Sequence, residues 1–451
     1  KELQMLNLRE YGTLKNTRAD LGIVQRDNTF IRPDLLGEGT DWQKELFTTA
    51  LMQSYNLSAS GGSETTTYSL GIGYLDQEGI VGGDKSGFLR NTARIALGAD
   101  LSDKIKLKTN VIYTYFNRKT LNENGLGSVL FNALNVPATL SPYDANGEYT
   151  LVPSTTGLGT EIINPLAQIA NTYNDYNYKK LNGNFGLDYK IFKGFTLSSS
   201  IGFNTSNSES KTFDKQISYG GKVFDVQRSS VRQGAVNDNN YSFDLFGTYN
   251  TKIADKHNIT ATLGTTIYKQ WGNGLFATGF DVPNNAWEFA DISLTTGIVD
   301  IKPNSSYEYD ERRLSYFGRL QYDYAGKYLF SAIIRRDAST KFGPDNRVGY
   351  FPSFTAGWNI SDENFFPKTE KFNALKLRLS YGTVGNDQIP NNGYLSLLTG
   401  EASYVFDGSI VNGTAIGQLP NPNLKWEEAQ KFDIGLDAKF FNDKLELVTD
   451  F

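Results

Sequence analysis

The sequence of 451 residues contains no cysteine and a single histidine, His257. Without thiols the chain has no disulfide bonds and no thiolate metal sites. No run of about 18 or more apolar residues occurs, so the sequence offers no membrane-spanning helix. The net charge of −5 excludes the basic footprint typical of nucleic-acid binding. The chain begins at Lys1 with neither a methionine nor a signal peptide, and we expect it to be part of a longer protein.

What the chain does contain favours β-structure. It has 44 glycines, 26 tyrosines and 29 phenylalanines, residue types that suit strands and tight turns better than helix bundles. Because a spanning helix is excluded, a membrane location requires a closed β-barrel.

The stretch 431–451 shows the pattern most clearly. Apolar residues at 432, 434, 436, 438 and 440 alternate with charged residues or glycine, which is the period of a strand with one apolar face. Asn442 and Asp443 then predict a turn, and Leu445, Leu447 and Phe451 continue the apolar side of a returning strand. The sequence therefore predicts an antiparallel hairpin whose apolar face is covered by lipid or by protein.

The same pattern recurs along the chain. Strands are predicted at about 55–60, 66–74, 88–100, 105–115, 181–190, 195–204, 241–249, 259–269, 314–324, 328–336, 351–360, 375–381, 431–440 and 445–451. Tight turns and longer polar connections largely alternate between them, with 75–86 read as a moderate loop. Outer-membrane barrels sort short turns to one rim and long loops to the other. We therefore predict an all-β fold, a transmembrane up-and-down antiparallel β-barrel.

The predicted strand 375–381 indicates which face meets lipid. Placing Lys376 or Arg378 against lipid would cost about 2–4 kcal/mol each near the midplane. We assign the alternate residues Leu375, Leu377, Leu379 and Tyr381 to lipid, which leaves a polar lumen. Residues 1–50 are the least strand-like, and Thr40-Asp41-Trp42-Gln43 has the spacing of a helix start.

Four groups of motifs resemble the SusC-type TonB-dependent transporters of Bacteroidota. They are, in chain order, Thr40-Asp41-Trp42-Gln43 with Asn56 to Glu64, Tyr68 and Tyr74 to Ile80; Gly318-Arg319, Lys327-Tyr328, Arg336-Asp337-Ala338-Ser339, Phe342-Gly343, Phe351-Pro352-Ser353 and Gly357-Trp358; Leu375 to Gly382 with Gly385-Asn386; and Asn421 to Glu427. Ala338 stands where the family often has glycine.

The resemblance implies a 22-stranded barrel closed by an N-terminal plug. It also implies a SusD-like surface lipoprotein as partner and import of oligosaccharides or peptides with energy delivered through TonB. On this basis residues 1–50 follow a plug, residues 51–451 form about 14 strands, and the plug, the TonB-contacting segment and the last strands lie outside the chain. No cofactor is expected.

Aromatic and amide residues in the predicted loops are candidates for contact with substrate or partner. They are Trp271, Phe276, Trp287, Asn284, Asn285, Tyr307 and Tyr309. Sugars stack on aromatic rings and bond to amides, but loop packing or contact with the lipoprotein is the favoured interpretation. Trp358 and Trp426 are interpreted as structural.

Catalytic and metal sites are weaker hypotheses. Carboxylates such as Glu427 with Glu428, or Asp337 with Asp345, are read as solvated loop charges rather than a glycosidase pair. His257, beside a tight turn, is read as a surface residue rather than a base. The run 237–240, Asn-Asp-Asn-Asn, lacks the spacing of a calcium loop and is read as a polar loop.

Three other functions are alternatives to active import. A passive porin shares every barrel feature, an outer-membrane enzyme lacks a visible catalytic constellation, and a soluble glycan-binding β-protein would bury the apolar face in protein. The sequence does not indicate the substrate.

Overall fold

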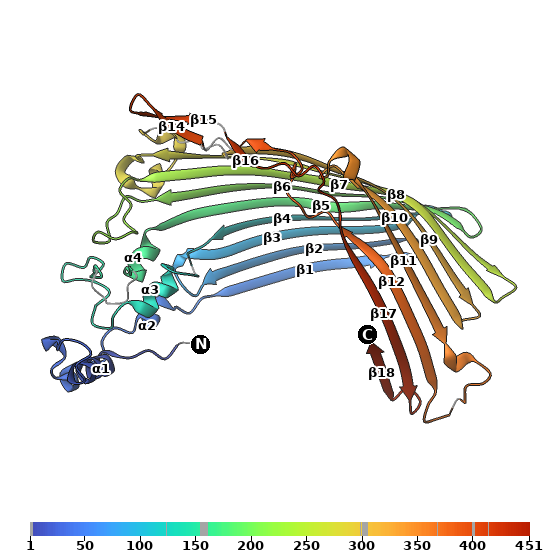
Figure 1. Ribbon diagram of the computed structural model, residues 1–451, viewed down its shortest axis with the longest axis horizontal. Helices are drawn as coiled ribbons and strands as arrows, with labels where there is room; N and C mark the ends of the chain where they lie inside the picture. The colour runs from blue at the N-terminus through green and yellow to red at the C-terminus, as the bar shows by residue number, and fades with distance from the viewer. Residues whose placement is uncertain are drawn as a thin grey trace.

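The computed structural model describes residues 3–122, 124–153, 161–297, 299, 305–367, 369–398, 402–413 and 415–451. The described chain is dominated by one large curved sheet, with short helices and loops gathered at one end of its strands (Figure 1). No helix among the described residues is long and apolar enough to cross a membrane.

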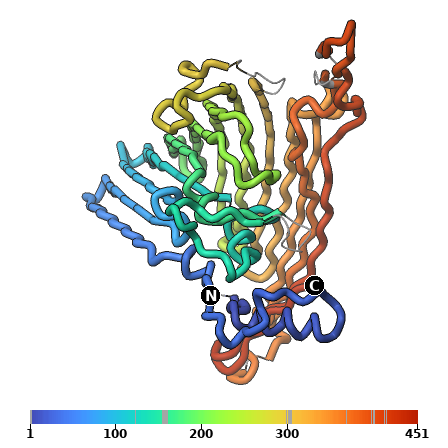
Figure 2. The backbone as a smooth tube through the Cα atoms, turned by 90° about the vertical axis from the view of Figure 1, so that its left-hand side faces the viewer, coloured from blue at the N-terminus to red at the C-terminus, as the bar shows by residue number. Residues whose placement is uncertain are grey.

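Within the described residues, fourteen strands form the main sheet, and each pairs antiparallel with its neighbours in sequence. The strands are β1 (Met52–Gly62), β2 (Thr66–Gly79), β3 (Gly83–Asp100), β4 (Ile105–Lys119), β5 (Thr172–Phe192), β6 (Phe195–Asp214), β7 (Ser230–Ile253), β8 (His257–Phe280), β9 (Ser306–Tyr324), β10 (Tyr328–Ser339), β11 (Val348–Asn359), β12 (Ala374–Asn386), β17 (Glu427–Phe440) and β18 (Leu445–Asp450). In Figure 2 the sheet follows an arc from the blue strands at its N-terminal side, through green and yellow, to the orange and red strands at its C-terminal side. The predicted up-and-down antiparallel order is confirmed.

Several strands are much longer than the sequence pattern predicts. β7 and β8 each run for 24 residues, whereas the pattern predicted 241–249 and 259–269. The added residues are largely polar or glycine on both faces, so they lose the apolar alternation that reveals a strand. The expected loop 75–86 is also wrong, because β2 continues to Gly79 and β3 begins at Gly83.

The connections are sorted between the two rims of the sheet. At one rim the strands join through 63–65, 101–104, 193–194, 254–256, 325–327, 360–373 and 441–444. At the other rim they join through 80–82, 120–171, 215–229, 281–305, 340–347 and 387–426. With the exceptions of 80–82 and 360–373, the first rim carries tight turns and the second carries longer loops. We call them the turn rim and the loop rim.

The tight turns use backbone conformations that their residues tolerate. Ala254 and Asp255 have φ of 48° and 53°, and Asn442 and Asp443 have φ of 55° and 64°. Positive φ at consecutive positions matches the twist of two-residue hairpins. The turn predicted at Asn442-Asp443 is therefore confirmed.

The two faces of the sheet differ in chemistry. Register pairs Tyr55 with Tyr74 and Leu57 with Ile72 at the β1 edge, and Leu379 with Ile434 near the other edge. When the register is followed from strand to strand, the aliphatic and aromatic side chains fall on one face of the sheet. We call it the outer face. The residues between them, including Ser58, Asn110, Ser200, Thr262, Arg319, Thr355 and Arg378, form the polar inner face.

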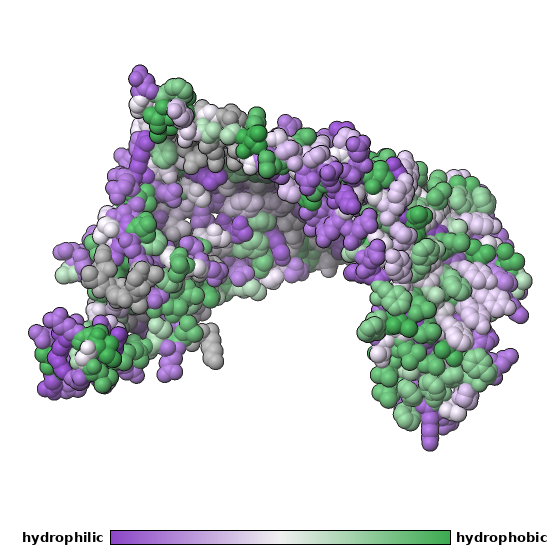
Figure 3. All heavy atoms as spheres, in the orientation of Figure 1, coloured by the Kyte–Doolittle hydropathy of each residue, from purple (hydrophilic) through white to green (hydrophobic). Residues whose placement is uncertain are grey.

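The outer face is exposed despite being apolar. Leu57, Ile72, Leu263, Phe330 and Phe354 are all more than half exposed. Hydrophobic residues gather over the turn-rim part of β12, β17 and β18, and the molecule is hollowed between its two ends (Figure 3). The sheet thus has no protein core of its own, as expected for a wall whose apolar face contacts lipid.

Most of the buried apolar residues among those described lie instead in the loops of the loop rim and in residues 3–50. The largest cluster joins Trp42 and Leu46 of α2 (Trp42–Leu46) to Val129 and Ala133 of α3 (Val129–Asn135) and to Ile162. A helix begins within the predicted motif Thr40-Asp41-Trp42-Gln43, but one residue later than the capping-box spacing indicates: the capping residue is Asp41, whose carboxylate accepts a hydrogen bond from Lys44 N. Residues 3–50 therefore pack with the loops of the loop rim.

Of the other described helices, all but the last belong to residues 3–50 or to the loops of the loop rim. They are α1 (Leu8–Asp20), with a capping box between Asn7 and Glu10, α4 (Pro165–Ala170), and the 3₁₀ turns η1 (Asn28–Phe30), η2 (Pro33–Leu35), η3 (Pro283–Asn285), η4 (Trp287–Phe289), η5 (Ile292–Leu294), η6 (Pro344–Asn346) and, at the turn rim, η7 (Ile360–Asp362). Two small sheets, β13 (Leu397–Leu398) with β16 (Ile416–Gln418) and β14 (Ala402–Phe406) with β15 (Ser409–Gly413), lie within 387–426.

One loop carries a tightly bonded carboxylate. Asp225 accepts hydrogen bonds from Tyr219 N at 2.6 Å, Ser218 Oγ at 2.7 Å and Gly221 N at 3.0 Å. The bond from Tyr219 N is the main cause that lowers the pKa of Asp225, so this turn loses its bonds only as the pH falls below the ordinary aspartate range. Burial raises the pKa of the neighbouring Tyr219 phenol to about 12.

The two-faced sheet predicts opposite outcomes for adjacent substitutions on β12. Leu379 is on the outer face, and Ser380 is on the inner face opposite Asp433. We expect Leu379→Arg to cost about 2–4 kcal/mol in a bilayer and to reduce the folded fraction of the full-length protein. Ser380→Arg, which adds the same charge beside a carboxylate, should fold normally. Heat-modifiable migration on gels measures both, and equal folding of the two variants would contradict the assignment of faces.

Candidate functional site

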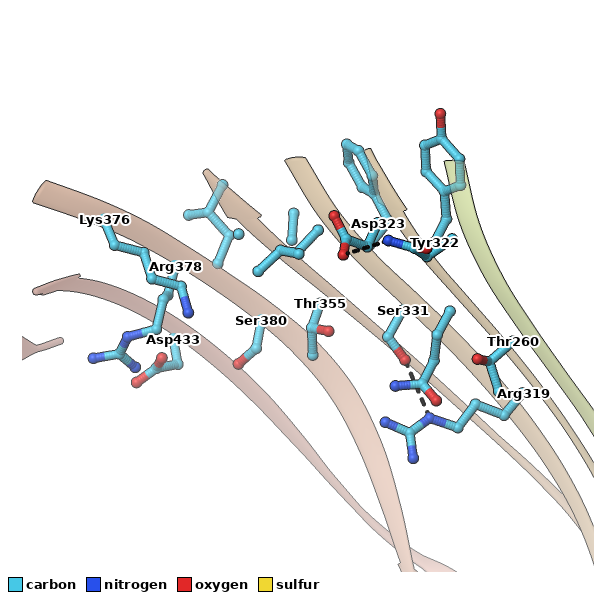
Figure 4. Close-up of a pocket in the computed structure, with 17 residues that line it drawn as sticks. Thr260, Arg319, Tyr322, Asp323, Ser331, Thr355, Lys376, Arg378, Ser380 and Asp433 are labelled. Atoms are coloured by element: carbon cyan, nitrogen blue, oxygen red, sulfur yellow. Dashed lines mark hydrogen bonds between the residues drawn. The ribbon is translucent and has the colours of Figure 1, made fainter. Parts of the chain in front are cut away.

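The inner face carries a groove near the turn-rim half of β8 to β12 and β17. Its volume is about 590 Å³, and cations and hydroxyls from neighbouring strands line it, among them Thr260, Arg319, Ser331, Thr355, Lys376, Arg378 and Ser380. Figure 4 shows these side chains on one side of the sheet, with Tyr322 on the opposite side. The groove therefore offers charged and hydroxyl groups to water and to polar solutes.

Ion pairs hold the cationic side of this groove. Arg378 donates to Asp437 at 2.7 Å and 3.0 Å and pairs with Asp450 at 2.7 Å. Arg319 Nε donates to Ser331 Oγ at 3.4 Å. Arg378 thus neutralises two carboxylates, and its inward position agrees with the sequence prediction.

A second inner-face feature lies closer to the loop rim and consists of hydrogen-bonded tyrosines. Tyr309 Oη donates to Asp238 Oδ1 at 2.6 Å, and Gln270 Nε2 donates to Tyr309 Oη at 3.4 Å. Tyr268 Oη donates to Gln270 Oε1 at 2.7 Å. The ring of Tyr307 stacks along Tyr309 with centroids 6.5 Å apart and an interplanar angle of 22°. We call these five residues the tyrosine ladder.

Glycines in β8 make room for the ladder. A Cβ at Gly274 would lie 2.5 Å from the Tyr307 ring, and one at Gly272 would lie 2.8 Å from the Tyr309 ring. The rings can therefore lie flat against the strand. Tyr307 remains 44% exposed, so the ladder presents an aromatic surface with a carboxylate and an amide at its edge.

Of the predicted site residues, the structure brings only Tyr307 and Tyr309 together in this way. Both lie on β9, and Trp271 and Phe276 lie on β8, so their predicted placement in long loops is wrong. Trp271 belongs to the outer face, where it meets Tyr241 edge-on at 6.1 Å. Phe276 shares the inner face, but its ring covers Gly234.

The remaining predicted residues lie in the loop 281–305. Trp287 stacks on Tyr173 at 5.7 Å and packs beside buried Phe213. Asn285 exchanges two hydrogen bonds of 2.8 Å with the backbone of Gln216, and Asn284 adopts a φ of 55°. The contacts of Trp287 and Asn285 support the packing interpretation for these two residues.

Sequence reasoning missed Asp238, Gln270 and Tyr268. The run 237–240 was read as a polar loop, which is wrong because it lies within β7. Its side chains alternate between the two faces and cannot converge on one cation. Among the described residues no group of three His, Cys, Asp or Glu could hold a metal ion. The signal that could have found Asp238 is its even spacing from Asp244, which also faces inward.

His257 and Trp426 lie where the sequence suggested. His257 opens β8 at the turn rim, and its Nδ1 is 2.8 Å from Tyr322 Oη. Trp426 is 8% exposed, packs against Phe342 and Phe351, and donates its indole N–H to Arg347 O at 2.9 Å. Three separate motifs thus meet in one buried cluster.

Comparisons with known proteins agree with this architecture. A family model described as TonB dependent receptor-like, beta-barrel, matches residues 116–451. The chain belongs to this family. It is 30% identical over 418 residues to TonB-dependent receptor P3 of Formosa agariphila, covering 91% of the chain and 40% of that protein. It is also 30% identical over 452 residues to TonB-dependent receptor SusC of Bacteroides thetaiotaomicron, covering 91% and 42%.

Solved structures extend the likeness to the fold. The RagAB peptide transporter aligns with a TM-score of 0.76 at 26% identity, covering 92% of this chain and 45% of that chain. The RagAB peptide importer in its closed-closed state aligns with a TM-score of 0.79 at 24% identity, covering 99% and 51%. The SusC-type resemblance is confirmed. The chain spans about 40% of the length of the curated relatives it matches.

The buried motif cluster predicts a local structural defect. Trp426→Ala removes a buried ring, for which losses of about 3–5 kcal/mol are typical, and should loosen the loop 387–426 that it anchors. Limited proteolysis of the full-length protein should cut this loop faster. Trp271→Ala, on the outer face, is the control and should leave the rate of cleavage unchanged. Equal cleavage in both variants would contradict the anchoring role.

Proposed function

We propose that this chain forms part of the wall of an outer-membrane β-barrel that imports oligosaccharides or peptides with energy delivered through TonB. The observation that carries the proposal is the continuous two-faced sheet, apolar outside and polar inside, with its longer loops at one rim. Family membership supports the dependence on TonB. Transport rather than catalysis is part of the proposal, because the family model describes a receptor barrel.

A SusD-like surface lipoprotein is the proposed partner at the loop rim. The likeness to SusC and to the RagAB peptide transporter supports this choice. The hairpin β14–β15 also suits a protein contact, because Tyr404, Phe406 and Ile410 are each more than 60% exposed. Its turn at Asp407-Gly408 has two positive φ values, a hairpin signal that sequence reasoning missed.

Within this function, the tyrosine ladder is the proposed solute contact. A planar aromatic surface edged by Asp238 and Gln270 offers stacking and hydrogen bonds to a sugar ring or a peptide group. The ladder lies on the inner face nearer the loop rim, on the path of a solute that enters from outside.

The ladder can be tested with two matched variants of the full-length protein. Tyr309→Ala removes the ring and the bond to Asp238, and we expect it to weaken solute binding about 5- to 30-fold. Trp271→Ala, on the opposite face of the same wall, should bind as the wild type does. Isothermal titration with the oligosaccharides or peptides that support growth measures both. Unchanged affinity in Tyr309→Ala would remove the ladder from the site.

Energy dependence separates active import from a passive pore. Cells that express the full-length protein should lose growth on its solute when TonB is deleted or when the partner lipoprotein is removed. A matched strain that takes up a small sugar through a general porin is the control. Uptake that persists at the same rate without TonB would support the passive porin instead.

A further inference from the structure

A hollow on the outer face of β8 to β10 has a chemistry that the transport function does not use. Its volume is about 560 Å³. Ile267, Leu314 and Ala338 are adjacent in register and form an apolar floor. Lys269, Arg312 and Arg347 lie at its end toward the loop rim. Among the described residues that line it there are cations but no carboxylate.

This hollow lies where the apolar band of the outer face ends. On the outer face, the next side chain of β8 after Lys269 is that of Trp271, which contacts Tyr241. Immediately beyond Trp271 the outer face carries a row of asparagines, in which Asn207 donates to Asn237 at 2.6 Å and Asn237 donates to Asn273 at 2.9 Å. Tryptophan and tyrosine at such a change mark the headgroup level of a bilayer. The cations therefore lie at the height of lipid phosphates.

The charges at this level are only partly neutralised. Asp310 pairs with Lys269 at 3.0 Å and with Arg312 at 2.8 Å, so one carboxylate serves two cations. Arg347 Nε donates to Phe342 O at 3.2 Å, and Arg336 lies 6.0 Å from the Tyr316 ring on the same outer face. No ion pair involves Arg336 or Arg347 within the described part of the chain. The cluster keeps an excess of positive charge toward the lipid.

We propose that the hollow binds a phosphorylated lipid of the outer leaflet. Its phosphate bonds to Arg312, Arg347 and Lys269, and one acyl chain lies over Ile267, Leu314 and Ala338. Guanidinium groups hold phosphate through paired hydrogen bonds, and the adjoining apolar floor distinguishes a lipid from a soluble anion. The inference rests on the membrane placement in the proposed function, which puts the loop rim on the outer side.

The test uses the purified full-length protein in detergent and lipid A as the probe. Native mass spectrometry and thermal unfolding should show that bisphosphorylated lipid A binds and stabilises the wild type, and that lipid A without phosphates does so much less. Arg312→Gln with Arg347→Gln should weaken binding roughly tenfold or more. Lys252→Gln with Lys256→Gln removes the same charge at the turn rim and should leave this binding unchanged.

Two results would overturn the proposal. One is equal binding of the phosphorylated and phosphate-free lipids by the wild type, a comparison that holds even where the double variant fails to fold. The other is full competition by inorganic phosphate at the same concentration, which would assign the hollow to a free anion. Neither measurement requires TonB or a transported solute, so failure of the import proposal would be seen separately.

Discussion

The backbone hydrogen bonding between sequential strands is the constraint on which this structure depends. A wall that faces lipid has no water to satisfy its peptide groups, so each strand must pair along its length with its neighbours. β7 and β8 show this most fully, pairing from Ser230 with Phe280 to Ile253 with His257 without a register shift. A slip of one residue would exchange the faces of a strand and place charges such as Arg378 against lipid.

Because side chains alternate, the same strands serve two environments. In β8, Trp271 and Lys269 face outward, whereas Gln270 faces inward as part of the tyrosine ladder. In β9, Arg312 faces outward and Tyr309 inward. A short step along one strand thus passes from the proposed lipid site to the proposed solute contact. The length of β8 and β9 makes this possible, because their parts toward the loop rim carry the cations of the proposed lipid site on one face and the tyrosine ladder on the other.

The loop rim adds packing that the sheet itself lacks. Phe342 and Phe351, from two neighbouring motifs, form one buried cluster with Trp426, which comes from a motif much later in the chain. Ser339, the last residue of another motif, donates to the carboxylate of Asp387 at 3.1 Å; Asp387 directly follows the motif Gly385-Asn386, and Arg313 lies 3.5 Å from the same carboxylate. Residues of the family motifs, or next to them, therefore hold the loops against the strand ends. This structural role accounts for the motifs without a part in solute binding.

The alternation of apolar and polar residues by itself determined the strand order, most turns of the turn rim and the two faces, because the period of two is a local property of the chain. The hairpin at 431–451 and the inward position of Arg378 were both predictable in this way. Strand lengths were not, because polar extensions such as 230–240 lack an apolar face.

Only the tertiary structure decided which candidate residues meet. It placed Trp271 outside, Trp287 in a packed loop and Tyr309 beside Asp238, although the last two residues are 71 positions apart. Contacts of that kind depend on register between strands and on glycines that admit a ring, and neither is visible in a local pattern.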